Sequence, residues 1–208
     1  MSFESVNPAT GESFARYETW DEPRIEAALT RAAAATSEWA ARPIAERAAH
    51  MRRAAGVLRE RQEEFARTMS LEMGKLLGEA RAEVEKCAWC CEFYAEHGPV
   101  YLADEAIATD AQRSLVVYQP LGAVLAIMPW NFPFWQVIRF AAPALVAGNV
   151  GLLKHASNVP RCALQLEEIF TQSGFPPGVF TTLMIAGSQA DRVIADARVH
   201  AVTLTGSS

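Results

Sequence analysis

The apolar residues of this chain recur with a helical period in the first half and with a strand-like pattern in the second. Between residues 43 and 60 they follow three- and four-residue steps, at Ile44, Ala48, Met51, Ala55 and Leu58, as on one face of a helix. Beyond residue 120, short apolar runs alternate with amphipathic segments. Such alternation is typical of βαβ units, so we expect an α/β fold with a helical N-terminal region followed by a parallel sheet.

The pattern divides the chain into three regions. Residues 1–20, with a turn signal at 7–12, predict a small hairpin arm. Residues 21–119 predict a helical region and a bridging strand at 114–118, with two or three helices up to residue 97 and breaks near Gly74 and Gly78. Asp21 can cap the first helix, and Pro23 suits its first turn. In residues 120–208 we expect strands at 121–128, 150–154, 179–185 and 201–205, and helices at 133–147, 160–173 and 188–196.

Four segments that directly follow the predicted strands are candidates for a ligand site. They are residues 129–131, 154–157, 187–188 and 205–208. In an open parallel sheet, ligands bind outside the carboxyl ends of the strands, so we expect all four segments to line one edge. A nucleotide cleft is the leading hypothesis, although the G-x-G-x-x-G fingerprint is absent from the sequence. The tetrapeptide T-G-S-S at 205–208 could begin a helix that receives phosphate, but it is weak support alone.

Composition and charge narrow the possible classes of protein. With 50% hydrophobic and 21% charged residues, the chain can build a sizeable core, and its net charge of −5 argues against a nucleic-acid partner. Cys87, Cys90 and Cys91 could form half a metal or redox site, but they lie in a helical pattern without partner ligands, so we expect no metal. Free thiols indicate a reducing compartment. The longest apolar run is a poor membrane-spanning helix, because prolines and Arg139 interrupt it. We therefore expect a cytoplasmic protein with no membrane partner.

The pentapeptide P-W-N-F-P at residues 129–133 resembles the signature of the NAD(P)-dependent aldehyde dehydrogenases. Further resemblances occur in the family's order: N-P-A-T-G-E at 7–12, L-E-M-G-K at 71–75, P-L-G at 120–122, A-P-A-L at 142–145, A-G-N at 147–149 and T-G-S at 205–207. Within the family, residues 133–137 and 153–159 most resemble the bacterial succinate-semialdehyde dehydrogenase branch. The resemblance implies an incomplete Rossmann-like cofactor domain after the helical region, NAD or NADP as the cofactor, and a small aldehyde as the substrate.

The resemblance gives Asn131 a catalytic role. The family oxidises an aldehyde through a cysteine thiohemiacetal, passes hydride to the nicotinamide and hydrolyses the thioester. Asn131 matches the asparagine whose side-chain amide stabilises the developing oxyanion, and a preorganised donor of this kind contributes about 2.7–4 kcal/mol. From the residues alone, capping of the helix that follows is an equally good interpretation.

The resemblance also implies a cofactor site along the strand ends. Lys154 matches the lysine that contacts the adenine-side ribose, with a solvated strand-end charge as the alternative. Ser157 stands where many NAD-preferring members have a glutamate. A serine leaves room for a 2′-phosphate, so we expect NADP to be tolerated, without predicting a preference. The expected cofactor-binding residues are Trp130, Asn131, Lys154, His155, Ala156, Ser157, Gly206 and Ser207.

Arg139 is the one charge on the otherwise apolar helix expected at 133–147, on the same face as Trp135. A lone arginine in such surroundings needs an anionic partner. Its position resembles the arginine that holds the distal carboxylate in succinate-semialdehyde dehydrogenases. Arg139 is therefore the expected substrate-binding residue for succinate semialdehyde or another short carboxylated aldehyde. An internal salt bridge with a nearby acid is the alternative.

Two family motifs that carry the chemistry do not occur in the sequence. The general-base glutamate of an E-L-G-G motif and the nucleophilic cysteine come later in the family than Ser208, and Cys162 has no flanking resemblance to that cysteine. We therefore expect the N-terminal portion of a semialdehyde dehydrogenase, without the catalytic domain and with an incomplete version of the family's homo-oligomeric interface. The alternative is a non-catalytic nucleotide-binding fragment or an inactive remnant. The 208-residue chain by itself is predicted to be inactive.

Overall fold

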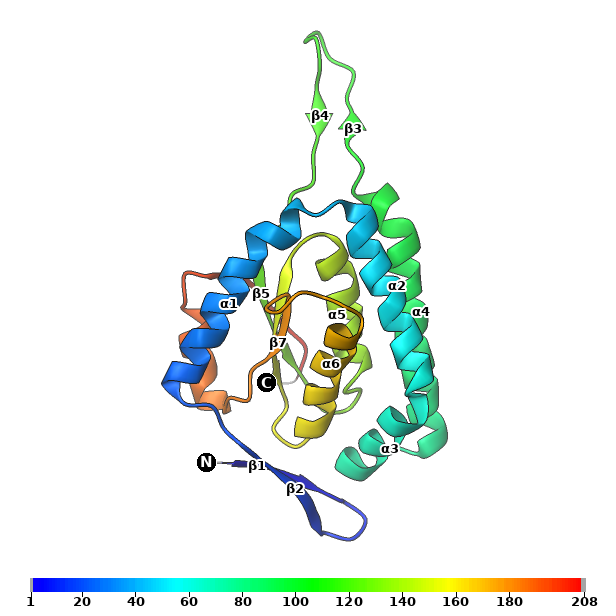
Figure 1. Ribbon diagram of the computed structural model, residues 1–208, viewed down its shortest axis with the longest axis vertical. Coiled ribbons are helices and arrows are strands. Elements are labelled where there is room, and N and C mark those ends of the chain that lie inside the picture. Colours follow the sequence, from blue (N-terminus) through cyan, green and yellow to red (C-terminus); the bar gives the residue numbers. More distant parts are fainter. Residues whose placement is uncertain (1, 207–208) are drawn as a thin grey trace.

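Helices form most of the first half of the chain in the computed structural model, which describes residues 2–206. A hairpin of β1 (Ser2–Val6) and β2 (Ser13–Glu18) comes first. Four helices follow: α1 (Glu22–Ala41), α2 (Ile44–Glu60), α3 (Gln62–Met73) and α4 (Leu77–Tyr101). Helices α2 and α4 lie side by side along one flank of the molecule, and α1 covers the opposite flank (Figure 1).

Two helix boundaries follow from local chemistry that is visible in the sequence. The Asp21 carboxylate accepts a hydrogen bond from the Arg24 amide at 3.1 Å and so caps α1. Helix α3 ends at Gly74, whose φ of 74° lies in the left-handed region that glycine adopts at little cost. The chain leaves α3 there and presents Lys75 and Leu76 before α4 begins.

Helix α4 differs from the expected pattern at both ends. Gly78 does not break the helix but lies in its first turn, and the helix runs past residue 97 through Pro99 to Tyr101. The added turn packs tightly, since a Cβ at Gly98 would come within 2.6 Å of the Val146 side chain. The absence of a side chain at Gly98 thus lets α4 pack closely on the sheet-covering helix α5 (Trp135–Val146). One break that the pattern did not predict falls at Arg61, between α2 and α3.

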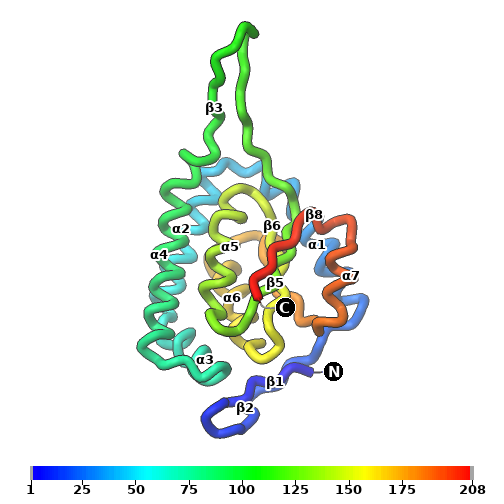
Figure 2. The backbone as a smooth tube through the Cα atoms, turned by 180° about the vertical axis from the view of Figure 1, so that it is seen from behind, coloured from blue at the N-terminus to red at the C-terminus, as the bar shows by residue number. Residues whose placement is uncertain are grey.

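A four-stranded sheet occupies the second half of the chain, in the order β7-β6-β5-β8. All three strand pairs are parallel, which confirms the predicted α/β fold class. The elements in chain order are β5 (Ala123–Met128), α5, β6 (Val150–His155), α6 (Pro160–Gln172), β7 (Phe180–Thr182), a 3₁₀ turn η1 (Gly187–Gln189), α7 (Ala190–Ile194) and β8 (Val199–Leu204). Strand β8 pairs only with β5 and forms one edge of the sheet (Figure 2).

Three elements are shorter than the hydrophobic pattern predicted. The strand expected at 179–185 is only β7, although Leu183, Met184 and Ile185 remain buried. The apolar residues at 183–185 are therefore buried without being part of a longer strand. The helix expected at 188–196 divides into η1 and α7. The strand expected at 114–118 keeps only β4 (Leu115–Val116), which pairs with β3 (Glu105–Ala106) in an arm that projects from the molecule (Figure 1).

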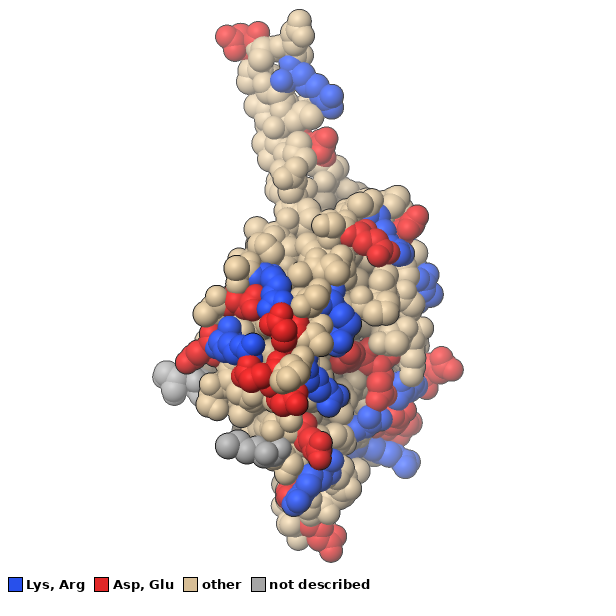
Figure 3. Space-filling view, turned by 60° about the vertical axis from the view of Figure 1, so that its left-hand side comes forward, with Lys and Arg blue, Asp and Glu red and all other residues tan. Residues whose placement is uncertain are grey.

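The four cysteines are free and buried. Burial raises the pKa of the Cys90 thiol to about 11 and the pKa of the Cys87, Cys91 and Cys162 thiols well above its ordinary value, so all four are poor nucleophiles. Within residues 2–206, no group of three or more His, Cys, Asp and Glu side chains is placed to hold a metal ion. None of the helices in this range is long and apolar enough to cross a membrane. Basic and acidic side chains are interleaved on the face shown in Figure 3.

Candidate active site

The carboxyl end of β5 opens into a cavity of about 370 Å³, which we call the strand-end cavity. Because the four strands are parallel, the segments that follow them emerge at the same edge of the sheet. The cavity brings together two of the four expected segments, 129–131 and 205–206, with a side chain from the start of α5. Its lining residues are Pro129, Trp130, Asn131, Gln136, Thr205 and Gly206.

The Asn131 side chain is exposed in this cavity. Its Oδ1 atom accepts a hydrogen bond from the amide of Phe132 at 3.1 Å, and its Nδ2 group has no partner among residues 2–206. Asn131 does not cap α5, because the amides of Phe134 and Trp135 at the start of that helix are bound by the carboxylate of Glu83 instead. The capping interpretation of Asn131 is therefore wrong, and its two amide hydrogens are available to a ligand oxygen.

The segment of β6 that carries Lys154 lies beside the cavity rather than in its lining. Lys154 is half-buried, and this burial lowers the pKa of its ammonium group. Its Nζ atom forms no ion pair or hydrogen bond within residues 2–206. Ser157 is exposed, and the backbone amide of Ala156 continues the sheet by donating to Met128 O at 3.0 Å. A half-buried cation without a partner can receive the hydroxyl or phosphate groups of a nucleotide ribose.

The His155 side chain faces the interior, away from any ligand at the edge. It is buried, and its Nδ1 atom lies 2.8 Å from the amide of Ala156 while Nε2 lies 2.9 Å from Pro133 O. A backbone amide must donate, so Nδ1 accepts and Nε2 carries the proton that is donated to Pro133 O. Burial lowers the pKa of His155 to about 4, so the ring is neutral at neutral pH. The side chain supports the Asn131 loop, and only its backbone belongs to the strand end.

Arg139 reaches across to the end of β8. Its Nη2 atom donates to the hydroxyl oxygen of Thr205 at 3.1 Å, and Thr205 lines the strand-end cavity. No acidic side chain among residues 2–206 forms an ion pair with Arg139, so the expected alternative of an internal salt bridge is not found there. Trp135, which was expected on the same helix face as Arg139, is covered by Lys86 of α4, whose Nζ atom lies 3.9 Å from the centroid of the indole ring. The guanidinium group of Arg139 is exposed and remains available to an anion.

The other expected residues divide into two groups. Trp130, with 49% of its surface exposed, flanks Asn131 and borders the cavity together with Gly206. Gly187 and Ser188 lie at the start of η1 after β7 and do not line the cavity. Ser207 and Ser208, the second half of the segment that could begin a helix at 205–208, lie outside the residues that the structure describes.

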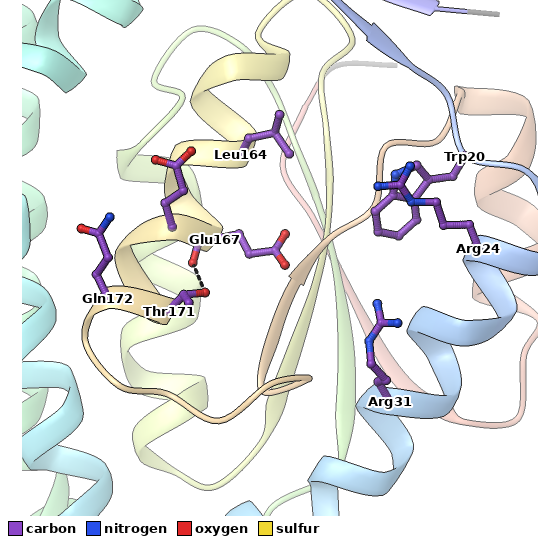
Figure 4. A pocket seen from close by; sticks show the side chains of 8 residues that line it. Trp20, Arg24, Arg31, Leu164, Glu167, Thr171 and Gln172 are labelled. Carbon is purple, nitrogen blue, oxygen red and sulfur yellow. Dashed lines mark hydrogen bonds between the residues drawn. The ribbon is translucent and has the colours of Figure 1, made fainter.

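A larger cavity of about 490 Å³ lies between α1 and α6 and shares no lining residue with the strand-end cavity. Arg24 and Arg31 of α1 point into it, and the Glu167 carboxylate of α6 points toward them (Figure 4). Glu167 accepts a hydrogen bond from the Thr182 amide of β7 at 2.9 Å, and burial raises the pKa of this carboxyl group. The carboxylate therefore covers a backbone amide of an edge strand, a common protection of sheet edges.

Several residues that shape the site carried no expected role. Glu83 binds the amides that begin α5, and Lys75 forms a buried ion pair with Glu83. Glu72 of α3 acts similarly on α6, because its carboxylate accepts from the amides of Arg161 at 2.8 Å and Cys162 at 2.9 Å at the start of that helix. The sequence could have indicated these roles, because both glutamates lie on the apolar face of a predicted helix, where a solvated charge is unexpected.

Comparisons with known proteins agree on one family. The profile described as "Aldehyde dehydrogenase family" matches residues 1–208. A probable succinate-semialdehyde dehydrogenase (NADP+) from Synechocystis is 52% identical over 207 residues, with 100% of this chain and 46% of that protein covered. The chain thus spans about half the length of the curated relatives it matches.

Solved structures of the family share the fold. Succinic semialdehyde dehydrogenase from Streptococcus pyogenes, in complex with NADP+, is 34% identical with a TM-score of 0.93, over 96% of this chain and 44% of that one. A NAD-dependent benzaldehyde dehydrogenase from Corynebacterium glutamicum is 31% identical with a TM-score of 0.93, over 100% of this chain and 46% of that one. With a family profile matched along its whole length and this shared architecture, the chain belongs to the aldehyde dehydrogenase family.

Proposed function

We propose that this chain serves the NADP-dependent oxidation of a short carboxylated aldehyde, with succinate semialdehyde as the substrate. The observation that carries the proposal is the exposed Asn131 amide at the end of β5, whose Nδ2 group has no partner within residues 2–206. The names of the relatives support the same substrate and cofactor. A nearby exposed arginine supports a substrate that carries a carboxylate.

In the proposed reaction, the cysteine thiolate that the family resemblance implies adds to the aldehyde carbon, and Asn131 donates a hydrogen bond to the aldehyde oxygen, which takes up the negative charge. The donor gains strength because Oδ1 is already bound to the Phe132 amide, which fixes the plane of the side-chain amide. A fixed donor needs no reorganisation when charge appears and contributes about 2.7–4 kcal/mol to stabilising the transition state. The nicotinamide, when bound, accepts the hydride.

Lys154 and Ser157 are the residues we propose for the ribose of the cofactor. The partnerless, half-buried ammonium group of Lys154 favours an anionic or hydroxyl-rich ligand. Ser157 brings no negative charge against a 2′-phosphate, which supports NADP as an accepted cofactor. Trp130 and Gly206 border the cavity in positions suited to the cofactor, and Ala156 contributes only backbone.

Arg139 is the residue we propose for the substrate's carboxylate. Its guanidinium group offers further donors beyond the one directed at Thr205, and a carboxylate can bind two of them at once. We also propose that the protein is cytoplasmic, in keeping with its four free thiols. Assembly as a homo-oligomer is a further proposal, which the family resemblance supports.

Because the 208-residue chain by itself is predicted to be inactive, the test is steady-state oxidation of succinate semialdehyde, with NADP and with NAD, by the protein isolated from its native source as it is expressed there, alongside Asn131→Asp. This variant keeps an oxygen that can bind the Phe132 amide, and it replaces the amide donor with an ionised carboxylate that repels the developing oxyanion. We expect kcat to fall at least about 100-fold, because the loss of one oxyanion donor alone costs about 100- to 1000-fold. A variant that keeps the full wild-type kcat would contradict the assignment of Asn131.

A further inference from the structure

The loop that carries Asn131 has few means of holding itself in place. It joins β5 to α5 between Pro129 and Pro133, and neither proline has an amide hydrogen to donate. Asn131 and Phe132 are exposed. A loop of this composition is expected to sample several conformations unless other elements restrain it. Side chains from three elements provide that restraint, and we call Lys75, Glu83 and His155 the loop cradle.

Glu83 restrains the loop from the side of α4. One carboxylate oxygen, Oε1, accepts hydrogen bonds from the amides of Phe134 and Trp135, both at 2.9 Å. These bonds are charge-assisted and lie at the positive end of the α5 dipole, and both features strengthen them. Only 2% of the Glu83 side chain is exposed, so water does not compete for the carboxylate.

Lys75 completes the same side of the cradle. It comes from the link between α3 and α4, and its ammonium group forms an ion pair with Oε2 of Glu83, with 6% of the lysine side chain exposed. The same ammonium group lies 3.8 Å from the ring centroid of Phe132, a cation–π contact. Lys75 thus neutralises Glu83 and also holds the residue that directly follows Asn131.

His155 restrains the loop from the opposite side, at the end of β6. Its Nε2–H group donates to Pro133 O at 2.9 Å, and the Ala156 amide fixes the ring by donating to Nδ1 at 2.8 Å. Together the three side chains contact four consecutive residues, 132–135, from two different regions of the fold. Asn131 is the residue immediately before this restrained segment.

We propose that Lys75, Glu83 and His155 are positioning residues for the reaction, which set the direction of the Asn131 amide through the backbone of residues 132–135. This inference rests on the proposed function. The three residues do not line the strand-end cavity, so they act through Asn131 rather than on the substrate. A merely structural role would lower stability, but it would not couple specifically to the Asn131 donor.

The test compares two substitutions of His155 in the natively expressed protein. His155→Leu removes the donor to Pro133 O, whereas His155→Gln retains an amide donor of similar reach. We expect the leucine variant to lose at least tenfold in kcat, with KM for the aldehyde and Kd for NADP within about threefold. The glutamine variant should keep at least a third of the wild-type kcat, and its activity also guards against a leucine variant that does not fold.

A double-variant cycle with Asn131→Asp separates positioning from structure. If His155 acts through the Asn131 donor, then adding His155→Leu to Asn131→Asp should change kcat less than twofold, because the donor is already gone. The same tenfold loss in both backgrounds would overturn the inference. A glutamine variant as impaired as the leucine variant would also overturn it.

Hydrogen exchange provides a measurement that does not depend on turnover. We expect the amides of Phe132 and of residues 134–136 to exchange at least tenfold faster in His155→Leu than in wild type, and at nearly the wild-type rate in His155→Gln. If wild type does not oxidise any aldehyde, the proposed function fails, and this exchange pattern still reports whether the cradle holds the loop. Unchanged exchange in His155→Leu would refute the cradle even in an active enzyme.

Discussion

Replacing Lys75 by methionine removes the charge that neutralises Glu83 while keeping much of the length of the side chain. With 6% of the Lys75 side chain and 2% of the Glu83 side chain exposed, water cannot replace the lost ammonium group. Removing one partner of a buried ion pair costs about 3–5 kcal/mol, because the other charge is left uncompensated. Glu83 still has two amide donors at 2.9 Å, so we expect a loss near the lower end, about 3 kcal/mol.

A companion variant tests whether charge is the cause. Combining Lys75→Met with Glu83→Gln leaves a neutral oxygen that can accept from the two amides, and no buried charge remains. Replacing both partners of a buried pair is often neutral, so the double variant should recover at least half of the lost stability. The measurement is urea unfolding at neutral pH, followed by far-UV circular dichroism and tryptophan fluorescence, with the midpoint and the slope compared among variants.

An exposed ion pair on the same helix serves as the control. Arg81→Met removes the partner of Glu63, where the two side chains are 44% and 54% exposed, and should cost less than about 1 kcal/mol. If Lys75→Met costs no more than this control, then water reaches Glu83 and the reasoning is wrong. A double variant no more stable than Lys75→Met would equally show that the loss came from packing rather than from charge.

Three further changes test the site. Arg139→Ala should raise KM for succinate semialdehyde at least tenfold and spare an uncharged aldehyde of similar size, whereas Arg113→Ala in the projecting β3–β4 arm should alter neither; equal effects on both substrates would exclude the anchor role. Ser157→Glu should weaken NADP at least tenfold relative to NAD in a binding titration, since a carboxylate would face the 2′-phosphate, and an unchanged ratio would argue against this position. Because burial lowers the pKa of His155 from an ordinary 6.5 to about 4, the unfolded chain binds the extra proton between these values. Wild type should therefore lose about 3 kcal/mol more than His155→Gln as pH falls from 6.5 to 4, and parallel urea midpoints for the two proteins would contradict this.

Much of the fold could be predicted because its elements follow from local rules. The cap at Asp21 and the stop at Gly74 are decided by neighbouring residues, and the structure has both. The parallel strands β5 and β6 follow from their burial on both faces. The predicted end of the last helix was wrong: α4 runs past Pro99, and Gly98 there packs against Val146, a contact that no local pattern encodes.

For the candidate site, the sequence pointed to exposed residues more readily than to the buried residues that hold them in place. Asn131 and Arg139 stood out because an amide among prolines and an arginine on an apolar helix are unusual in local context. The family resemblance implied a cofactor contact for His155, yet its ring turns inward to Pro133 O. Successive residues of a strand point to opposite faces, so a ligand-facing Lys154 does not imply a ligand-facing His155. Glu83 was missed because its partners lie 51 and 52 residues away.

The chemistry of the loop explains why its supports must come from afar. A side chain that is to meet a ligand has to project from the backbone into solvent, so Asn131 lies on an exposed turn whose prolines cannot join a hydrogen-bonded ladder. The orienting bonds then have to reach the backbone that follows, where Pro133 O and the amides of Phe134 and Trp135 are the groups bound by His155 and Glu83. Such acceptors and donors are effective only when dry, so their partners lie on buried faces of α4 and β6. Transplanting the P-W-N-F-P pentapeptide to another sheet would therefore transfer Asn131 but not the buried partners that orient its side chain.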